Sequence, residues 1–191
     1  MAFYKDERLA LFIDGASLFA TSKALDMEVD FRKLLTEFRS KGRLLRANYY
    51  TAILEDDDYS PLRPLVDWLS YNGYNVIKKP AREFTDREGK RRVRSSMSVE
   101  IAVDMLETAA HVDHIIFFAG DGDFRRLVEK VKSEGCRVTV VSSVKGQSAT
   151  ISDDLRREAD VFIDLEDLAD LVSRPRRVGE PSKHLAETDH D

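Results

Sequence analysis

The chain has 191 residues, which fits one domain with a full core better than two. Hydrophobic residues make up 42% of it and charged residues 34%, as in an ordinary globular protein, and there is no long uncharged apolar run, which excludes a transmembrane helix. The single cysteine, Cys136, excludes a disulfide framework and a cysteine-rich metal site.

Charge is unevenly distributed along the chain. The formal net charge of −5 does not favour nucleic acid binding by the molecule as a whole. The stretch from Lys78 to Arg94, however, holds eight basic and three acidic residues, a local charge of +5. This basic stretch predicts contacts with phosphate groups, and a solvated hairpin without a ligand explains it equally well. The segment Met1–Asp6 is short, contains the charged residues Lys5 and Asp6, and does not resemble a signal peptide, so we expect a reducing, cytoplasmic location and no membrane partner.

Apolar segments predict strands that alternate with helices. Continuous apolar runs are typical of strands buried on both faces, and apolar residues at i, i+3, i+4 and i+7 are typical of helices. These patterns predict strands at 9–13, 44–51, 75–78, 115–119, 138–141 and 161–163, with helices at 31–38, 62–69 and 124–131. The sequence therefore predicts an α/β fold of three layers, in which helices cover both faces of a mostly parallel sheet of five to six strands.

Glycines and polar segments predict where the elements end. Gly42, Gly73 and Gly135 follow the three helices, and we expect each to adopt the left-handed conformation that closes a helix. Residues 83–93 predict a polar hairpin around Glu88 and Gly89. Residues 174–191 contain few apolar side chains and two prolines, so we expect a disordered tail after a single domain of residues 1–173.

Aspartates follow two of the predicted strands directly. Asp14 comes after the first strand, and Asp121 and Asp123 come after the strand at 115–119. In open α/β sheets, ligands bind beyond the carboxyl ends of the strands, so both motifs lie on the expected edge. Carboxylates brought together there repel one another unless they share a proton or a cation, and an oxygen-only ligand set suits Mg²⁺ or Mn²⁺. The sequence therefore predicts a divalent-metal site, and such a site can support phosphoryl-transfer chemistry.

Simpler explanations remain open for these residues. Asp123 could be the N-cap of the following helix, and Asp14 could be an isolated turn residue. The glycines at 120 and 122 do not form a dinucleotide fingerprint, because Arg125 stands where a third small residue belongs.

Three segments resemble the NYN domain family, and specifically its LabA-like bacterial branch within the PIN-like nuclease group. They are IDGASLF at 13–19, SMSVEIAVDML at 96–106 and AGDGDFRRLVE at 119–129, and the similarity extends from Leu9 to Leu171. The resemblance implies a parallel sheet of order 3-2-1-4-5, which places the first and fourth strands side by side. It also implies metal-dependent cleavage of RNA, with Asp14, Asp121 and Asp123 as catalytic and metal-binding residues.

Two positions depart from the family pattern. Ser17 stands where the family usually has asparagine, and Ser98 stands where it usually has an aspartate of the metal cluster. We expect both serines to support the site rather than to hold the metal, and divalent-metal binding to be weakened. Asp104 also matches a family position and is a further candidate metal ligand. On an ideal helix, however, it lies about 120° around the axis from Ser98, so it would not point at the same spot.

The predicted RNA contacts come from two basic groups. Arg125 and Arg126 open the helix after the aspartates, where arginines and a helix N-terminus both favour phosphate. The basic hairpin adds Lys90, Arg91, Arg92 and Arg94. Ser142, Ser143 and Ser148, after the strand at 138–141, are weaker candidates for phosphate contacts.

Three hypotheses about function follow. The first is a Mg²⁺- or Mn²⁺-dependent RNA endonuclease built on the aspartate cluster. The second is a catalytically weakened or inactive NYN protein that binds RNA, or a protein partner or second copy of itself, as a regulatory module; Ser17 and Ser98 motivate it. The third, a phosphoacceptor or Toprim-type module, fits least well, because Asp14 occupies the position where Toprim domains need glutamate.

Overall fold

The computed structural model describes residues 3–54, 62–85, 91–94, 96–146 and 148–175. Its centre is a seven-stranded sheet of order β4-β3-β2-β1-β5-β6-β7, in which only the β3–β4 pair is antiparallel. The strands are β1 (Arg8–Asp14), β2 (Arg43–Leu54), β3 (Asn75–Thr85), β4 (Arg91–Arg94), β5 (His114–Phe118), β6 (Arg137–Ser142) and β7 (Val161–Asp164). The six parallel strands are those predicted from the apolar runs. The predicted order 3-2-1-4-5 is confirmed, because the fourth and fifth parallel strands along the chain are β5 and β6, which follow β3, β2 and β1 in the sheet. β7 adds a sixth parallel strand beside β6.

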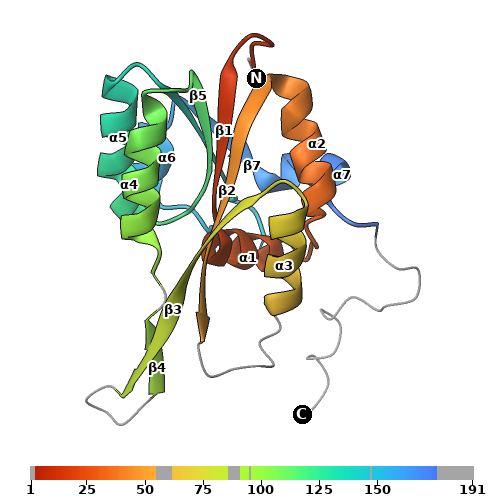
Figure 1. The fold of residues 1–191 in the computed structure, drawn as a ribbon, viewed down its shortest axis with the longest axis vertical. Helices are drawn as coiled ribbons and strands as arrows, with labels where there is room; N and C mark the ends of the chain where they lie inside the picture. Colours follow the sequence, from red (N-terminus) through yellow and green to blue (C-terminus); the bar gives the residue numbers. More distant parts are fainter. Residues whose placement is uncertain (1–2, 55–61, 86–90, 95, 147, 176–191) are drawn as a thin grey trace, which may run out of the picture.

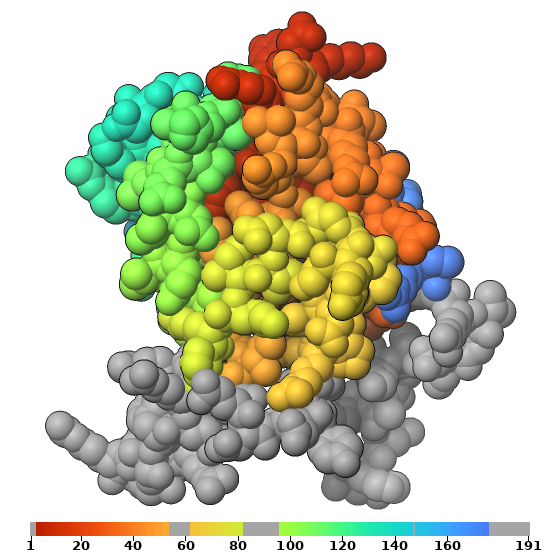
Figure 2. All heavy atoms as spheres, in the orientation of Figure 1, coloured from red at the N-terminus to blue at the C-terminus, as the bar shows by residue number. Residues whose placement is uncertain are grey.

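Helices cover both faces of the sheet, as predicted for a three-layer fold (Figure 1). They are α1 (Gly15–Ala24), α2 (Phe31–Lys41), α3 (Arg63–Tyr71), α4 (Ser98–Ala109), α5 (Arg125–Ser133), α6 (Asp153–Glu158) and α7 (Ala169–Val172), with short 3₁₀ turns at η1 (Gly122–Phe124) and η2 (Leu165–Leu168). The space-filling view shows α4 in green and α2 in orange on opposite sides of the yellow surface that α3 and β3 form (Figure 2). Within the described ranges, no helix is long and apolar enough to cross a membrane.

Two apolar clusters, one on each face of the sheet, form the core. On β1, Phe12 packs with residues of α4 and α5, whereas Leu11 and Ile13 pack with residues of α1 and α2. These side chains are fully buried. Burial of both faces explains why the strand is a continuous apolar run rather than an alternating one.

The three helix-closing glycines behave differently from one another. Gly73 and Gly135 have φ values of +94° and +86°, which confirms the predicted left-handed conformation. Gly42 has φ −178°, so that prediction was wrong at this position. A Cβ atom at Gly42 would lie 2.9 Å from the Glu7 carbonyl oxygen, so this glycine allows close approach of two backbone segments instead.

The basic segment forms an antiparallel pair at one end of the sheet. Arg82 of β3 lies opposite Arg94 of β4, and Thr85 lies opposite Arg91. This pairing agrees with the predicted hairpin, whose turn lies outside the described residues. The predicted tail begins at Arg174, whose backbone N–H donates a hydrogen bond to the Glu28 carbonyl oxygen. Residues 176–191 lie outside the described part of the chain.

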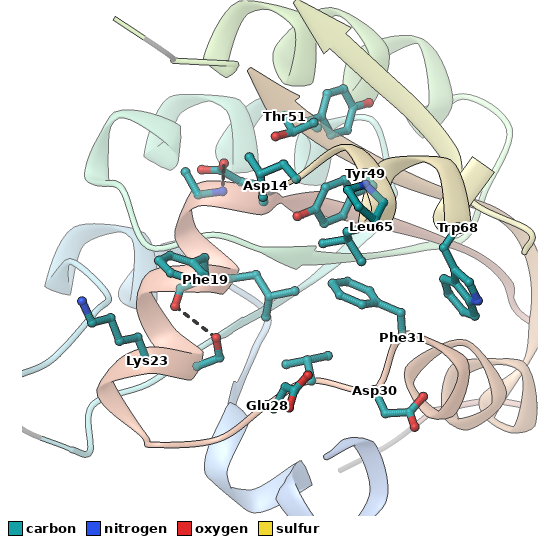
Figure 3. Close-up of a pocket in the computed structure, with 18 of the residues that line it drawn as sticks. Asp14, Phe19, Lys23, Glu28, Asp30, Phe31, Tyr49, Thr51, Leu65 and Trp68 are labelled. Atoms are coloured by element: carbon teal, nitrogen blue, oxygen red, sulfur yellow. Dashed lines mark hydrogen bonds between the residues drawn. The ribbon is translucent and has the colours of Figure 1, made fainter. Parts of the chain in front are cut away.

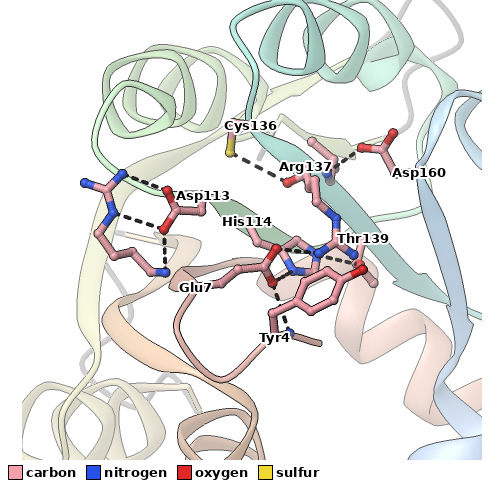
Figure 4. Close-up of polar contacts among 10 residues, drawn as sticks. Tyr4, Glu7, Asp113, His114, Cys136, Arg137, Thr139 and Asp160 are labelled. Carbon is pink, nitrogen blue, oxygen red and sulfur yellow. Dashed lines mark hydrogen bonds and ion pairs between the residues drawn. The ribbon is translucent and has the colours of Figure 1, made fainter. Parts of the chain in front are cut away.

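A buried histidine, His114, lies at the amino end of β5, among polar side chains that include Glu7 and Thr139 (Figure 4). The His114 side chain is 1% exposed, and its Nε2 lies 2.7 Å from Thr139 Oγ1. Its Nδ1 lies 3.3 Å from Glu7 Oε2, and Glu7 also pairs with Arg137. Burial and the nearby Arg137 charge lower the pKa of His114 below its usual 6.5. The fold therefore favours the neutral imidazole.

Acidification should destabilise the protein through His114. The pKa of His114 is lower in the folded state than in the unfolded state, so just below pH 6.5 the unfolded chain binds more protons. The contribution of the neutral His114 to the free energy of unfolding is therefore complete above pH 6.5 and is lost as the pH falls. Urea unfolding between about pH 7.5 and about pH 5 measures this slope. His114→Gln should reduce the slope, while a matched His111→Gln change at an exposed position should leave it intact. Equal slopes for both variants would contradict the assignment.

Candidate active site

Asp14 and Asp121 lie at the same edge of the sheet. Asp14 is the last residue of β1, and Asp121 follows the end of β5 by three residues. The strands are parallel neighbours, with Ile13 opposite Phe118. The carboxyl ends of adjacent parallel strands thus bring both aspartates to the edge where ligands bind in open α/β sheets.

The Asp14 carboxylate is fixed by the first turn of α1. Its Oδ1 accepts a hydrogen bond from the Ala16 backbone N–H at 3.2 Å, and its Oδ2 accepts one from Ser17 Oγ at 2.6 Å. Ser17 is therefore in direct contact with Asp14, and its supporting role at a metal site stays a prediction. The absence of a side chain at Gly15 lets this turn pack closely against β2, because a Cβ there would lie 2.7 Å from Tyr49 Oη and 2.8 Å from the Tyr50 carbonyl oxygen.

In the second motif, Asp121 rather than Asp123 is the capping residue. Asp121 Oδ1 accepts a hydrogen bond from the Asp123 backbone N–H at 3.0 Å and so begins η1. The alternative in which Asp123 is the N-cap of the next helix is wrong, because Phe124 occupies the N-cap of α5. Both aspartates are exposed, so their carboxylates are accessible to a ligand.

Asp104 and Ser98 have partners of their own. Asp104 Oδ2 accepts a hydrogen bond from Tyr50 Oη at 2.9 Å, and Tyr50 is the β2 residue opposite Asp14. Burial and the Asp104 carboxylate raise the pKa of Tyr50, which keeps the phenol protonated as a donor. Ser98 Oγ lies 2.8 Å from Ser96 Oγ. Asp104 is thus tied to the strand beside Asp14, a link that periodicity along α4 does not reveal.

A polar network that the sequence did not predict supports this edge. Thr150 Oγ1 lies 2.9 Å from Thr21 Oγ1 on α1 and 3.1 Å from Ser142 Oγ at the end of β6. Ser143 Oγ donates to Asp164 Oδ1 at 2.9 Å. Ser142 and Ser143 are 2% and 0% exposed, so the suggestion that these two serines contact phosphate is wrong, whereas for the exposed Ser148 it stays a prediction. Ser142 and Ser143 hold the loop after β6 in place.

The structure describes the side chains of two of the five predicted RNA-binding arginines, Arg125 and Arg126. Arg125 and Arg126 are exposed on α5, where they pair with Glu158 and Glu129 at 3.7 Å and 2.8 Å. The backbones of Arg91, Arg92 and Arg94 belong to β4, while Lys90 lies outside the described residues. The contacts of all six with RNA stay predictions.

A large cavity opens beside Asp14 (Figure 3). Its volume is about 1290 Å³, and its wall is formed by α1, the segment from Met27 to Asp30, the start of α2, the end of β2 and α3. The lining includes five aromatic residues, namely Phe19, Phe31, Tyr49, Tyr50 and Trp68.

The donor chemistry at the edge fits a hard divalent cation. Asp14, Asp121 and Asp123 offer carboxylate oxygens, the ligands that Mg²⁺ and Mn²⁺ prefer. Among the described residues, no three acidic, histidine or cysteine side chains are grouped closely enough to hold a metal by themselves. Magnesium is commonly held by one or two carboxylates, water and substrate phosphates, and two aspartates from adjacent strands suit that arrangement.

Comparison with known proteins gives the family. The model of the NYN domain matches residues 8–166. The low amplitude and bright protein LabA of Synechococcus elongatus is 34% identical over 181 residues, which cover 93% of each chain. A crystal structure of a protein of unknown function from Vibrio parahaemolyticus superposes with a TM-score of 0.70 at 25% identity, covering 90% of this chain and 99% of that one. NYN domains are PIN-like nuclease domains that generally bind RNA and use divalent metals. This chain belongs to the NYN domain family and is a LabA-like member of it.

Proposed function

We propose that this protein is an RNA endonuclease that depends on Mg²⁺ or Mn²⁺. The observation that carries the proposal is the placement of Asp14 and Asp121 at the carboxyl ends of paired parallel strands in an NYN domain. Asp14 and Asp121 would hold the cation together with water and an RNA phosphate, with Asp123 as a further carboxylate at the same edge, and the cation when bound supplies Lewis acidity toward a phosphodiester and its attacking water.

The surrounding residues prepare the carboxylates for this role. The Ser17 hydroxyl and the Ala16 backbone N–H each donate to one Asp14 oxygen, which fixes the orientation of the carboxylate. The Asp123 backbone N–H does the same for Asp121. A carboxylate that is already held in one orientation loses less rotational freedom when it binds a cation. These hydrogen bonds therefore favour cation binding by Asp14 and Asp121.

RNA would reach this edge past basic residues. Arg125 and Arg126 begin α5, two and three residues after Asp123, and Arg91, Arg92 and Arg94 belong to β4. Arginine suits phosphate because its planar guanidinium donates two parallel hydrogen bonds. Contacts of this kind position a strand without reading its sequence.

The proposal predicts cleavage that depends on a divalent metal. Purified protein should cut an end-labelled single-stranded RNA in Mg²⁺ or Mn²⁺, and an excess of EDTA should stop the reaction. Products resolved on a denaturing gel measure it, and a preparation of the Asp14→Asn variant controls for contaminating nucleases. Cleavage that persists in EDTA, or that is equal in the variant, would contradict the proposal.

A second function has specific support. Asp104 is already bonded to Tyr50, and Ser98 replaces the acidic residue that the family pattern places in the metal cluster. Both features fit a regulatory module that binds RNA or a protein and cleaves weakly or not at all. RNA binding without any cleavage in Mg²⁺ or Mn²⁺ would favour this function over the first.

A further inference from the structure

The last described residues of the chain lie in the wall of the cavity of about 1290 Å³. Ser173 forms an antiparallel bridge with Val29, and the Arg174 backbone N–H donates to the Glu28 carbonyl oxygen at 2.9 Å. The Arg174 guanidinium also pairs with the Glu28 carboxylate. Val29, Glu28 and Arg174 all line the cavity. Residues 176–191 are therefore attached directly beside it.

The bridge also sets the direction in which the chain leaves. Because Ser173 and Val29 are antiparallel partners, a strand continued past Pro175 would pass Met27 and then the end of α1. Met27 and Lys23, which is close to that end, line the same cavity (Figure 3). The chain is thus directed along the cavity wall rather than away from it.

The segment 176–191 is long enough to cross the cavity. Its sixteen residues span up to about 50 Å when extended, whereas a domain of this size is about 40 Å across. The cavity reaches from Glu28 to Trp68, so both lie within range of the segment (Figure 3). Attachment keeps a tethered segment at a local concentration on the order of millimolar, so modest contacts are sufficient to hold it.

The charges of the wall suit a segment of mixed sign. Three acidic and three basic side chains line the cavity, namely Asp14, Glu28, Asp30, Lys23, Arg32 and Arg174. Such a balance favours neither a polyanion nor a polycation. Residues 176–191 carry three basic and four acidic residues, a formal charge of −1 with both signs along the segment.

The wall also exposes apolar side chains. Phe19 is 67% exposed and Leu62 is 37% exposed, and both line the cavity. Exposed apolar groups that gather in one place mark an interaction site. The segment 176–191 contains Val178 and Leu185, which could cover these groups.

We propose that residues 176–191 fold back into this cavity, place Val178 and Leu185 against its apolar wall, and cover the approach to Asp14. The tether favours this occupant over a separate peptide or a second copy of the chain. A ligand that reaches Asp14 through the cavity would have to displace the segment, so the contact would regulate access to the aspartate edge. The inference goes beyond the proposed function and does not depend on it, because the position of the segment is measured without metal or RNA.

The chain provides its own reporter for this contact. Trp68 is its only tryptophan and lines the cavity, and Cys136 is its only cysteine. Cys136 is buried, and burial raises the pKa of its thiol to about 12, so it should react slowly with alkylating reagents at neutral pH. A cysteine introduced by Ser182→Cys can therefore be labelled selectively with bimane, a fluorophore that tryptophan quenches on contact.

We expect the bimane at position 182 to be quenched in the folded chain. Trp68→Phe should raise its fluorescence about twofold or more, because a segment that is docked most of the time spends that time near the indole ring. A bimane on Ser133→Cys is the control, since this exposed position is on α5, whose core residues pack on the other face of the sheet from Trp68. The control should fluoresce equally with and without Trp68. Equal fluorescence at position 182 in both backgrounds would overturn the proposal and leave the cavity to a separate partner.

A second pair of variants tests whether the apolar wall holds the segment. Val178→Asn combined with Leu185→Asn removes both apolar side chains without a change of charge and should abolish the quenching, whereas Val178→Ile combined with Leu185→Met should keep it. Circular dichroism confirms that all variants are folded. Quenching that survives the asparagine pair would overturn the proposal, because the wall would then not hold the segment. So would quenching that grows with protein concentration, which would assign the cavity to the segment of a second copy.

Discussion

Replacing Gly120 with alanine should lower the free energy of unfolding by roughly 3 kcal/mol. A Cβ atom at this position would lie 1.8 Å from the Thr150 carbonyl oxygen, far inside van der Waals contact. The loop cannot easily retreat, because the Thr150 backbone N–H is bonded to the Ser143 carbonyl oxygen at 2.9 Å. The Ser152 backbone N–H likewise bonds the Gly120 carbonyl oxygen at 2.9 Å. Urea unfolding followed by circular dichroism measures the loss.

The neighbouring glycine of the same motif is the matched control. A Cβ at Gly122 would lie 3.0 Å from Ser152 Oγ, a side-chain atom that accepts a hydrogen bond from the Leu155 backbone N–H and would have to shift by only a few tenths of an ångström. Gly122→Ala should therefore change stability by less than about 1 kcal/mol. Similar losses for the two variants would mean that the clash with the Thr150 backbone does not determine the requirement for Gly120.

Replacing Asp14 with asparagine should reduce RNA cleavage at least about a hundredfold, or ~2.7 kcal/mol in the barrier. The substitution removes the negative charge that would hold a divalent cation. The amide oxygen of asparagine can still accept the Ala16 hydrogen bond, so α1 keeps its N-cap and the fold should survive. Initial cleavage rates at saturating Mn²⁺ give the comparison.

A distant aspartate controls for the change in charge alone. Asp6 is exposed and precedes β1, so it lies toward the amino ends of the parallel strands, at the opposite edge of the sheet from Asp14. Asp6→Asn should cleave at the natural rate. A loss of activity in both variants, or in neither, would remove the assigned role of Asp14.

The strand order was predictable because it depends on features that the sequence displays. Strands buried on both faces must be apolar throughout, as at Leu9–Ile13 and Ile115–Phe118, so they stand out from amphipathic helices. Parallel strands joined by helices then place their carboxyl ends, and the aspartates after them, on one edge. The resemblance to the NYN family supplied the pairing of the first and fourth strands.

Contacts between distant segments were not predictable in the same way. Gly42 was expected to close a helix, whereas its role is the close approach to Glu7 from another strand end. The Tyr50–Asp104 hydrogen bond joins residues 54 positions apart. Neither periodicity nor local spacing contains that information, because the sheet register and the helix position must both be known first.

Asp121, and not Asp123, is the N-capping residue, and this difference from the sequence-based alternative has a local cause. A 3₁₀ turn at Gly122–Phe124 precedes α5, so the capping position moves back to Asp121. Sequence alone favoured a helix that begins directly after Asp123. The cavity beside Asp14 was also not predicted, since its wall is assembled from four separate elements and the loop between two of them.

Calorimetric titration of Mn²⁺ and Mg²⁺ into metal-free protein tests the central claim most directly, because it measures the metal site without requiring a known RNA. The account predicts binding with a dissociation constant in the micromolar to low-millimolar range, and no binding by Asp14→Asn. Absence of heat in both proteins, or equal binding by both, would contradict a metal-dependent site at Asp14 and Asp121.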